Sequence, residues 1–570
     1  MLIKNSFLFF LLTISTVFPD ETSTLRRVQS HVLINDLPSA YVEISEGVRR
    51  YPTSRSLREK EIEVLAAMGD EKKMLWRWEA YAREFPDATT QTFLLESMGW
   101  GVINKGFSTA SPLTRAIALI AANLSQSAKG IDLLVQGTQD PNSAVRAISL
   151  ELSLKNRDAR LQERVLVMIQ NETAFQARLA ALKAAGAMKI KAAEHSLRQI
   201  LTSQSSTDEE KGIAVQSLAM ISENPSRDDI WRLMQSPRMG LRLLGCELVA
   251  VFRRTQDVDL IVPLLHDHSP VIRKAALQVM GVLRVPNIRQ AIAPLTKDST
   301  PEVAMIAAWV LMLDGDPVGQ EALRKWLGHD NQEIRCFAAG CLRAGGKYAN
   351  PLLHQVFYTT QDPYLKINAA MGLIGQRRDC PEACEAIYQQ LMTKDARWMW
   401  QEEGIFKAVA PSRVRHRPDI PQFPEVTNQL VRLELLQLLA FLNFPKTQLA
   451  LKDFLQQKTF GITGVVVALL LTEGEEESLD LIRPLLHDPD PKVQAQAALI
   501  LAIWGREENV IKHLEYVYEN SERPVKEKVL EGMGRIGSTH SLPFLVGKLS
   551  EPHQHLRMIA AAGIIQCVNH

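Results

Sequence analysis

The chain has 570 residues, more than one compact core holds, so its length predicts several domains or an array of repeats. Its 65 basic and 64 acidic residues nearly cancel, which argues against a global field that steers the chain to nucleic acid or acidic membranes. Six cysteines are too few for a disulfide framework in a chain of this length.

The first residues are typical of an export signal. Lys4 precedes the apolar run FLFFLLTISTVF at residues 7–18, and polar residues follow it. This order is the signal-peptide pattern, and the run is too short to span a bilayer comfortably. We therefore expect a signal peptide or N-terminal anchor over residues 1–21, with a buried first helix as the alternative.

Residues 22–107 have a period of their own. Two aromatic–proline pairs, at 51–52 and 85–86, stand 34 residues apart. Helices are predicted over Ser56–Met68 and Glu71–Glu84. A 34-residue period resembles tetratricopeptide repeats. The alternative is a non-repetitive helical cap, which an array needs because its first unit would otherwise expose an apolar face.

A short motif recurs over residues 108–393 and 426–570. Pro263 begins PLLHDHSPVIRKAAL, and Pro484 begins PLLHDPDPKVQAQAAL. A polar residue before the turn caps a helix, proline fits its first turn, and Val or Ile with paired Ala gives it an apolar face. Each unit is therefore predicted to be an antiparallel helix pair that buries its apolar face by stacking on the next. Equivalent positions follow every 31 residues at Arg242, Arg273, Ala304, Arg335 and Lys366.

The repeated D-x-x-P-x-V-R-x-A-A-x-x-L pattern resembles HEAT repeats. The short period is similar to the PBS-lyase HEAT-like variety of bacterial exported proteins. The resemblance implies an all-α fold, namely an α-solenoid or superhelix of the armadillo type. It also implies a ladder of turn aspartates and helix arginines between neighbouring units, which Ala304 and Gln494 interrupt. The pairs that match this ladder are Asp140 with Arg146 and Asp267 with Arg273.

Residues 394–425 break the array. The stretch PSRVRHRPDIPQFPE holds four prolines and cannot continue as one helix. Irregular insertions in a tight array are often functional, and Arg and Trp are favoured interface anchors. The alternative is a solvated loop whose tryptophans cover a damaged repeat. The candidate partner-binding residues are Trp398, Trp400, Arg413, Arg415, His416 and Arg417.

Catalytic, metal and cofactor signals are weak throughout. The sequence His266-Asp267-His268 looks like a metal site, but it recurs as His487-Asp488, which indicates a repeat turn. The sequence has no P-loop, no G-x-S-x-G elbow, no H-E-x-x-H and no dinucleotide fingerprint. We therefore expect no metal, no cofactor and no enzyme activity.

The resemblance implies a non-catalytic scaffold or adaptor that binds a protein or peptide. If the N-terminal segment is a signal, the expected location is the periplasm or envelope; otherwise it is the cytoplasm. Membrane association is expected only through that segment. One alternative is a lyase related to chromophore-attachment HEAT proteins, which requires a clustered polar pocket. Another is a nucleic-acid-binding helical-repeat protein, which requires a continuous basic groove.

Overall fold

The structure is a computed structural model, and it describes residues 20–203, 205–222, 225–376, 380–393, 435–456 (without 437, 441 and 443) and 477–569. Every regular element within these ranges is helical, which confirms the predicted all-α solenoid of antiparallel helix pairs. The chain divides into two compact units. Unit 1 comprises Met1–Gly130 and Lys526–His570, and unit 2 comprises Ile131–Val525.

Unit 1 begins with two helix pairs related by the predicted period of 34 residues. The first pair is α1 (Glu21–Leu33) and α2 (Leu37–Arg50), and the second is α3 (Arg55–Met68) and α4 (Glu71–Glu84). A polar side chain caps each helix by accepting a hydrogen bond from a backbone amide of the first turn. The helices predicted over 56–68 and 71–84 are confirmed; the resemblance to tetratricopeptide repeats stays a prediction.

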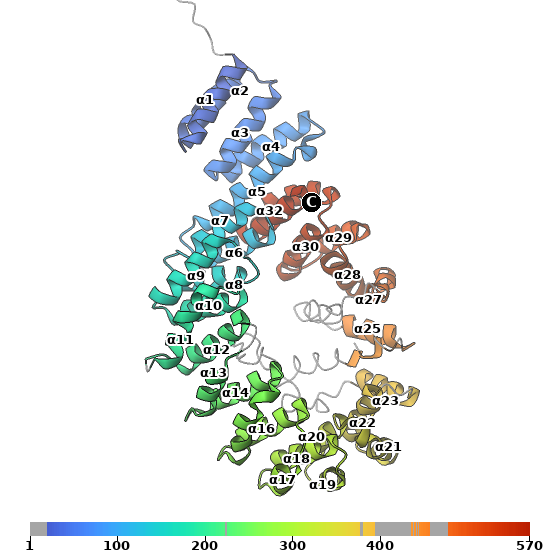
Figure 1. Cartoon of the computed structure of the whole chain (residues 1–570). Helices are drawn as coiled ribbons and strands as arrows, with labels where there is room; N and C mark the ends of the chain where they lie inside the picture. Colours follow the sequence, from blue (N-terminus) through green and yellow to red (C-terminus); the bar gives the residue numbers. More distant parts are fainter. Residues whose placement is uncertain are drawn as a thin grey trace, which may run out of the picture. The chain divides into compact units, whose positions relative to one another are not determined.

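The remaining helices of unit 1 come from both ends of the chain (Figure 1). After α4 they are η1 (Ala88–Thr90), α5 (Thr92–Phe107) and α6 (Pro112–Leu124), and near the C-terminus η13 (Thr539–Ser541), α31 (Leu542–Gly547), η14 (Lys548–Ser550) and α32 (Gln554–Asn569). Two helices, α7 (Ala128–Gly137) and α30 (Arg523–Ile536), cross the boundaries between the units.

Helix α5 packs mainly against α3, α6 and the C-terminal α32, which lies alongside it in Figure 1. Glycines make these close approaches possible. A Cβ on Gly106 would lie 2.3 Å from Sδ of Met558 in α32, and one on Gly101 would lie 2.6 Å from the carbonyl oxygen of Ala66 in α3. The N-terminal segment therefore covers both the first repeat helix, α6, and the last one, α32.

Unit 2 consists of consecutive helix pairs in which each helix packs mainly on its sequence neighbours. Several repeats have a proline in the first turn of their first helix, as predicted, including α16, α18, α22 and α28. In sequence order the described elements are α8 (Ser143–Leu152), α9 (Ala159–Asn171), α10 (Phe175–Ala187), η2 (Lys191–Ala193), α11 (Glu194–Thr202), α12 (Asp208–Ser222), α13 (Arg227–Met234), α14 (Met239–Val251), η3 (Thr255–Asp257), α15 (Val258–Ile261), η4 (Val262–His266), α16 (Pro270–Leu283), α17 (Arg289–Ile292), η5 (Ala293–Lys297), α18 (Pro301–Leu313), α19 (Pro317–Leu327), α20 (Gln332–Arg343), η6 (Gly346–Ala349), α21 (Asn350–Thr359), α22 (Pro363–Gly375), α23 (Pro381–Met392), α25 (Thr447–Gln456), α27 (Glu477–Asp480), η10 (Arg483–His487), α28 (Pro491–Ile500), the π-helical turn η11 (Leu501–Gly505), η12 (Glu508–Val510) and α29 (Ile511–Glu519).

An arginine ladder connects neighbouring repeats of unit 2. Arg273 on α16 donates backward to the carbonyl oxygen of Asp267 at 2.9 Å and forward to both carboxylate oxygens of Asp298, each at 2.9 Å. The carboxylate of Asp267 in turn accepts from Arg242 of the preceding repeat at 3.1 Å. The predicted ladder is confirmed, and the carboxylate that each arginine binds belongs to the following turn. Arg146 with Glu172 and Arg335 with Asp362 repeat this geometry.

Inside unit 1 the same ladder ends on the N-terminal helices. Arg557 on α32 donates backward to the carbonyls of Glu551 and Pro552, as the other ladder arginines do to their turns. Its forward partner is Glu71 on α4, with 2.8 Å between Arg557 Nε and Glu71 Oε2. These two residues are 486 positions apart in sequence. Helix α4 therefore supplies the acidic group that a following repeat would supply.

None of the helices in the described ranges is long and apolar enough to cross a membrane.

Candidate protein-binding groove

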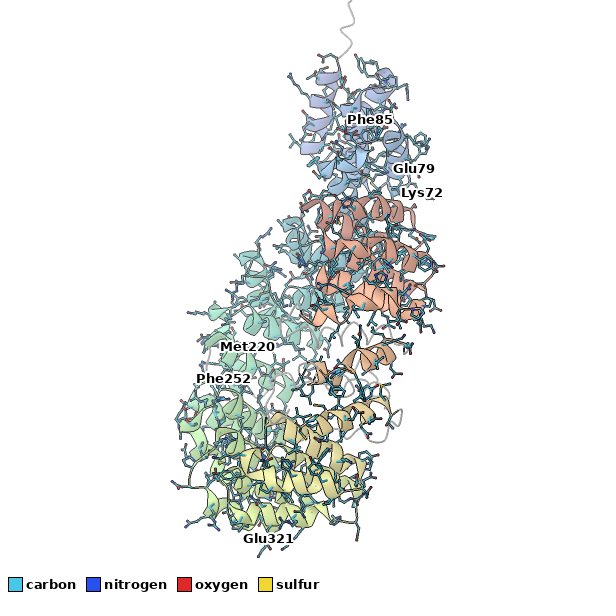
Figure 2. The ribbon with its side chains drawn as sticks, turned by 90° about the vertical axis from the view of Figure 1, so that its right-hand side faces the viewer. Lys72, Glu79, Phe85, Met220, Phe252 and Glu321 are labelled. Carbon is cyan, nitrogen blue, oxygen red and sulfur yellow. The ribbon has the colours of Figure 1, made fainter. Side chains whose placement is uncertain are left out.

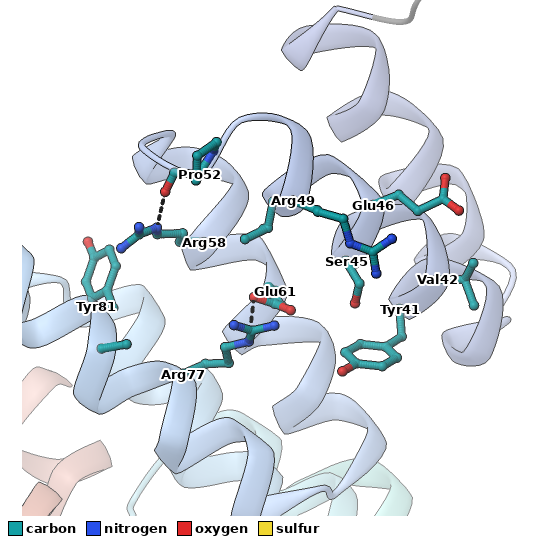
Figure 3. Close-up of a pocket in the computed structure, with 12 residues that line it drawn as sticks. Tyr41, Val42, Ser45, Glu46, Arg49, Pro52, Arg58, Glu61, Arg77 and Tyr81 are labelled. Carbon is teal, nitrogen blue, oxygen red and sulfur yellow. Dashed lines mark hydrogen bonds and ion pairs between the residues drawn. The ribbon is translucent and has the colours of Figure 1, made fainter.

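A hollow of about 660 Å³, which we also call the groove, lies among α2, α3 and α4 of unit 1 (Figure 3). Helix α3 packs against both α2 and α4, so it forms the floor of the hollow. The lining combines arginines with apolar and aromatic side chains and a buried glutamate. The residues that line it are Tyr41, Val42, Ser45, Glu46, Val48, Arg49, Pro52, Arg58, Glu61, Arg77, Ala80 and Tyr81.

One face of α2 forms the first wall. Tyr41, Ser45 and Arg49 follow each other at intervals of four residues, which places them in a row along one side of a helix. Val42, beside this row at the edge of the hollow, is 60% exposed. The wall therefore offers an apolar contact next to a positive charge.

Glu61 lies at the floor, with a side chain that is 1% exposed. Its Oε2 pairs with Nε of Arg77 on α4 at 3.0 Å, the contact drawn in Figure 3. Its Oε1 is buried, as is the hydroxyl of Ser45 on the facing wall, and a hydrogen bond from Ser45 helps to lower the pKa of Glu61. Burial raises the pKa of the Glu61 carboxyl above its ordinary value, and the Arg77 guanidinium opposes that rise. The floor thus holds a buried carboxylate whose polar neighbours are Arg77 and Ser45.

Two further polar side chains of the lining are fixed by their neighbours. Arg58 donates from Nε to the carbonyl of Pro52 at 2.6 Å and pairs through Nη1 with Glu84, also at 2.6 Å. The Tyr81 hydroxyl donates to Glu59 and accepts from Nε of Arg55. Burial, together with Glu59, raises the pKa of Tyr81 to about 12, so this phenol stays neutral at physiological pH. These contacts hold one end of the hollow in shape.

Arg49 differs from the other two arginines of the lining. It is exposed, and within the described residues it makes no hydrogen bond or ion pair. Figure 3 shows its guanidinium near Ser45, whereas the Glu46 carboxylate points away from the hollow. Arg77 uses its Nε for Glu61, which leaves its two Nη groups for another acceptor. The hollow therefore presents unused cationic donors above a buried carboxylate.

The other polar groups that the sequence singles out lie elsewhere. The Asp267 carboxylate is engaged by Arg242 and by the backbone amide of Ser269, and the neighbouring His268 is 85% exposed. Among the described residues, no three His, Cys, Asp or Glu side chains are grouped as metal ligands are. The turn of Asp267 is therefore a repeat turn that takes part in the arginine ladder, as its recurrence in the sequence predicts.

The candidate partner-binding residues of the insertion lie outside the described residues. So do the first 19 residues, which include nearly all of the expected signal segment. Whether these segments bind a partner or direct export therefore stays a prediction. The candidates concerned are Trp398, Trp400, Arg413, Arg415, His416 and Arg417.

The groove residues are absent from the candidates that the sequence yields, although one signal for them exists. Leu57, Glu61 and Leu65 are four residues apart on the predicted helix and all are buried. A carboxylate between two core leucines is out of place on an apolar face, because an unpaired buried charge is costly. That misplacement indicates a partner such as Arg77, or a ligand. The free state of Arg49 has no comparable signature in the sequence.

Comparison with protein families matches residues 258–340 and 479–565 to HEAT repeats. A comparison with curated proteins finds no match. Among solved structures, yeast importin-beta (Kap95p) is 13% identical, with 97% of this chain and 76% of that chain covered and a TM-score of 0.37. The Caenorhabditis elegans myosin chaperone UNC-45, in complex with an Hsp90 peptide, is 11% identical, with 96% and 81% covered and a TM-score of 0.29. Kap121p bound to Pho4p is 13% identical, with 95% and 76% covered and a TM-score of 0.36. At these scores the likenesses carry no argument about function.

Proposed function

We propose that this HEAT-repeat solenoid is a non-catalytic scaffold that binds a segment of a protein partner, and that the groove of α2, α3 and α4 is one of its contact sites. The observation that carries the proposal is that the ladder arginines have hydrogen-bond and ion-pair partners whereas Arg49, in the lining of the hollow, has none among the described residues. The ladder arginines of the repeats are paired with carboxylates and backbone carbonyls. Arg49 stands unpaired at an open hollow with the exposed Val42 beside it. Arginine next to an apolar contact is the composition favoured at protein interfaces.

The chemistry of the groove supports binding over catalysis. A nucleophile needs a hydrogen bond to a base that activates it. The Ser45 hydroxyl and the Glu61 carboxylate are the nearest approach to such a pair in the lining, but both oxygens are buried and the carboxylate is paired with Arg77. We therefore place the lyase alternative second to the scaffold.

Site-specific cross-linking in the full-length chain tests the proposal. A photoreactive residue replaces Val42 at the edge of the groove, or Lys72 on α4 in a matched control. Lys72 is exposed, does not line the hollow, and lies at the outer edge of α4 in Figure 2. We expect discrete protein adducts in native cells from position 42 and not from position 72. Equal adduct patterns from both positions, or none from position 42, would refute the assignment of the groove.

We also propose that the chain is exported, on the strength of Lys4 and the apolar run at residues 7–18. Fractionation of the native cells with N-terminal sequencing of the purified protein tests this. Recovery from the cytoplasm with the first residues intact would remove the proposal and leave the scaffold function standing.

A further inference from the structure

One joint between successive helix pairs of unit 2 lacks both halves of the arginine ladder. The ladder arginines Arg242 and Arg273 are followed, at the same interval of 31 residues, by Ala304. The carboxylates that these arginines bind, Asp267 and Asp298, are followed at that interval by His329. The ladder pair is therefore missing where α18 and α19 meet α20 and α21.

His329 occupies the structural place of the missing carboxylate. Oδ1 of Asp298 accepts a hydrogen bond from the backbone amide of Thr300 at 2.8 Å. Nδ1 of His329 accepts in the same way from the backbone amide of Asn331, at 3.0 Å. An imidazole that accepts at Nδ1 is neutral, so it closes the turn without offering a charge to an arginine. The arginine's own position holds Ala304, which is fully buried and has no polar side-chain atom.

Each of the other joints between the described helix pairs from α8 to α23 has at least one ion pair. One of them also lacks the ladder pair, because Lys211 and Ser236 stand at the ladder positions between α12 and α14. There Arg227 on α13 supplies a substitute by pairing with the buried Asp257 at 2.7 Å. The ion pairs at the remaining joints are Arg146–Glu172, Arg198–Asp229, Arg242–Asp267, Arg273–Asp298 and Arg335–Asp362.

The joint of α18 and α19 with α20 and α21 is held instead by neutral and apolar contacts of the described residues. Trp309 Nε1 donates to the carbonyl oxygen of Ala344 at 3.1 Å. Gln320 Nε2 donates to a carbonyl oxygen of the opposite turn, that of Tyr348, at 2.9 Å. Apolar contact has no preferred direction, so it persists while packed helices slide, whereas an ion pair is held to one geometry.

From this pattern we infer that the joint of α18 and α19 with α20 and α21 is a hinge within unit 2. The helix pairs before it and those after it move as two stiffer blocks, and α20 slides on α18 between them. A scaffold with such a hinge adjusts the spacing of its contacts to a bound partner without breaking an ion pair. The inference concerns unit 2 alone and does not depend on the groove of unit 1.

Distances between spin labels in the full-length chain test the inference. Genetically encoded residues carry the labels, so the native cysteines need no replacement. One pair of labels, at Gln256 and Glu321, spans two joints that have ion pairs. The other pair, at Glu321 and Gln389, spans the hinge and one such joint. All three side chains are exposed, and at about 8–10 Å per packed helix the labels of each pair lie roughly 20 Å apart. We expect the second pair to give the broader distance distribution.

Two double variants test whether the missing ion pair is the cause. Arg242→Ala with Asp267→His removes the ladder pair between α14 and α16 and should broaden the distribution of the first label pair. Ala304→Arg with His329→Asp installs the pair at the hinge and should narrow the distribution of the second. Because an arginine at a buried position can prevent folding, the first variant carries the test by itself where the second does not fold.

Equal widths for the two label pairs in the unaltered chain would overturn the inference. So would an unchanged distribution of the first label pair in the variant that removes the ladder pair. A folded variant with the ladder pair installed at the hinge, but with no narrowing of the second distribution, would overturn it as well.

Discussion

The contact between Arg557 and Glu71 provides the sharpest test of how unit 1 is held together. Arg557→Leu keeps the apolar stem of the side chain and removes its bond to Glu71 at 2.8 Å, together with its bonds to the carbonyls of Glu551 and Pro552 at 2.8 and 3.1 Å. The Glu71 carboxylate, 8% exposed, then keeps only Lys105 at 3.9 Å. A charge-assisted bond contributes about 1.5–3 kcal/mol, and removing one partner of a fully buried pair costs about 3–5 kcal/mol. Because Arg557 is 19% exposed, we expect a loss of about 2–3 kcal/mol in the local stability of α32.

Hydrogen exchange measured by mass spectrometry reports this local loss, and it does not require the whole chain to unfold in one step. Amides of α32 and of the facing part of α5 should exchange about 30- to 150-fold faster in Arg557→Leu. The control is Arg27→Leu, which breaks an exposed pair with Glu43 within α1 and α2 and should cost at most about 1 kcal/mol. Unchanged protection of α32 in Arg557→Leu, or the same loss in Arg27→Leu, would refute the reasoning.

Three further predictions follow from single contacts. Gly101→Ala should lower the stability of unit 1 by about 1–3 kcal/mol in thermal unfolding, because its Cβ would meet backbone atoms of α3, whereas Gly240→Ala, with nothing within 4 Å of its Cβ, should not. Glu61→Gln should raise the melting temperature more, or lower it less, at pH 7 than at pH 4. The pKa of Glu61 in the folded chain lies above the ordinary value of 4.5, so the ionised carboxylate destabilises the fold as pH rises through that window. Equal shifts of the melting temperature at both pH values would contradict this. Arg273→Ala should speed amide exchange in α16 and in the turn of Asp298 more than Lys274→Ala does, an exchange difference that a ladder without energetic value would not produce.

Much of the fold can be predicted from local sequence patterns, namely capping residues, apolar spacing and the repeat period. The helices predicted at 56–68 and 71–84 are found at Arg55–Met68 and Glu71–Glu84, because capping residues and apolar spacing act within one turn. The turn before α16 follows for the same reason. Stacking of consecutive pairs needs only nearest neighbours, so the repeat period indicates it directly.

Contacts between distant segments have no such local signature. Gly99 and Gly106 face α32 across 450 or more positions of sequence, and in the sequence they are simply glycines within a helix. Glu71 reads as an ordinary first-turn carboxylate that favours the helix dipole, although its partner is Arg557. The groove escaped prediction similarly, because the free state of Arg49 depends on which side chains fail to reach it.

The docking of α32 on α5 also constrains how the chain matures and how it can change in length. In most stacked-repeat proteins each repeat contacts only its neighbours, so order can begin in any repeat and spread from there. Here α5 emerges from the ribosome long before its partner, so its glycine-lined side must stay uncovered until α32 is synthesised. A deletion that removes α32 would leave that apolar side without its cover, so this array is not freely shortened from its C-terminal end.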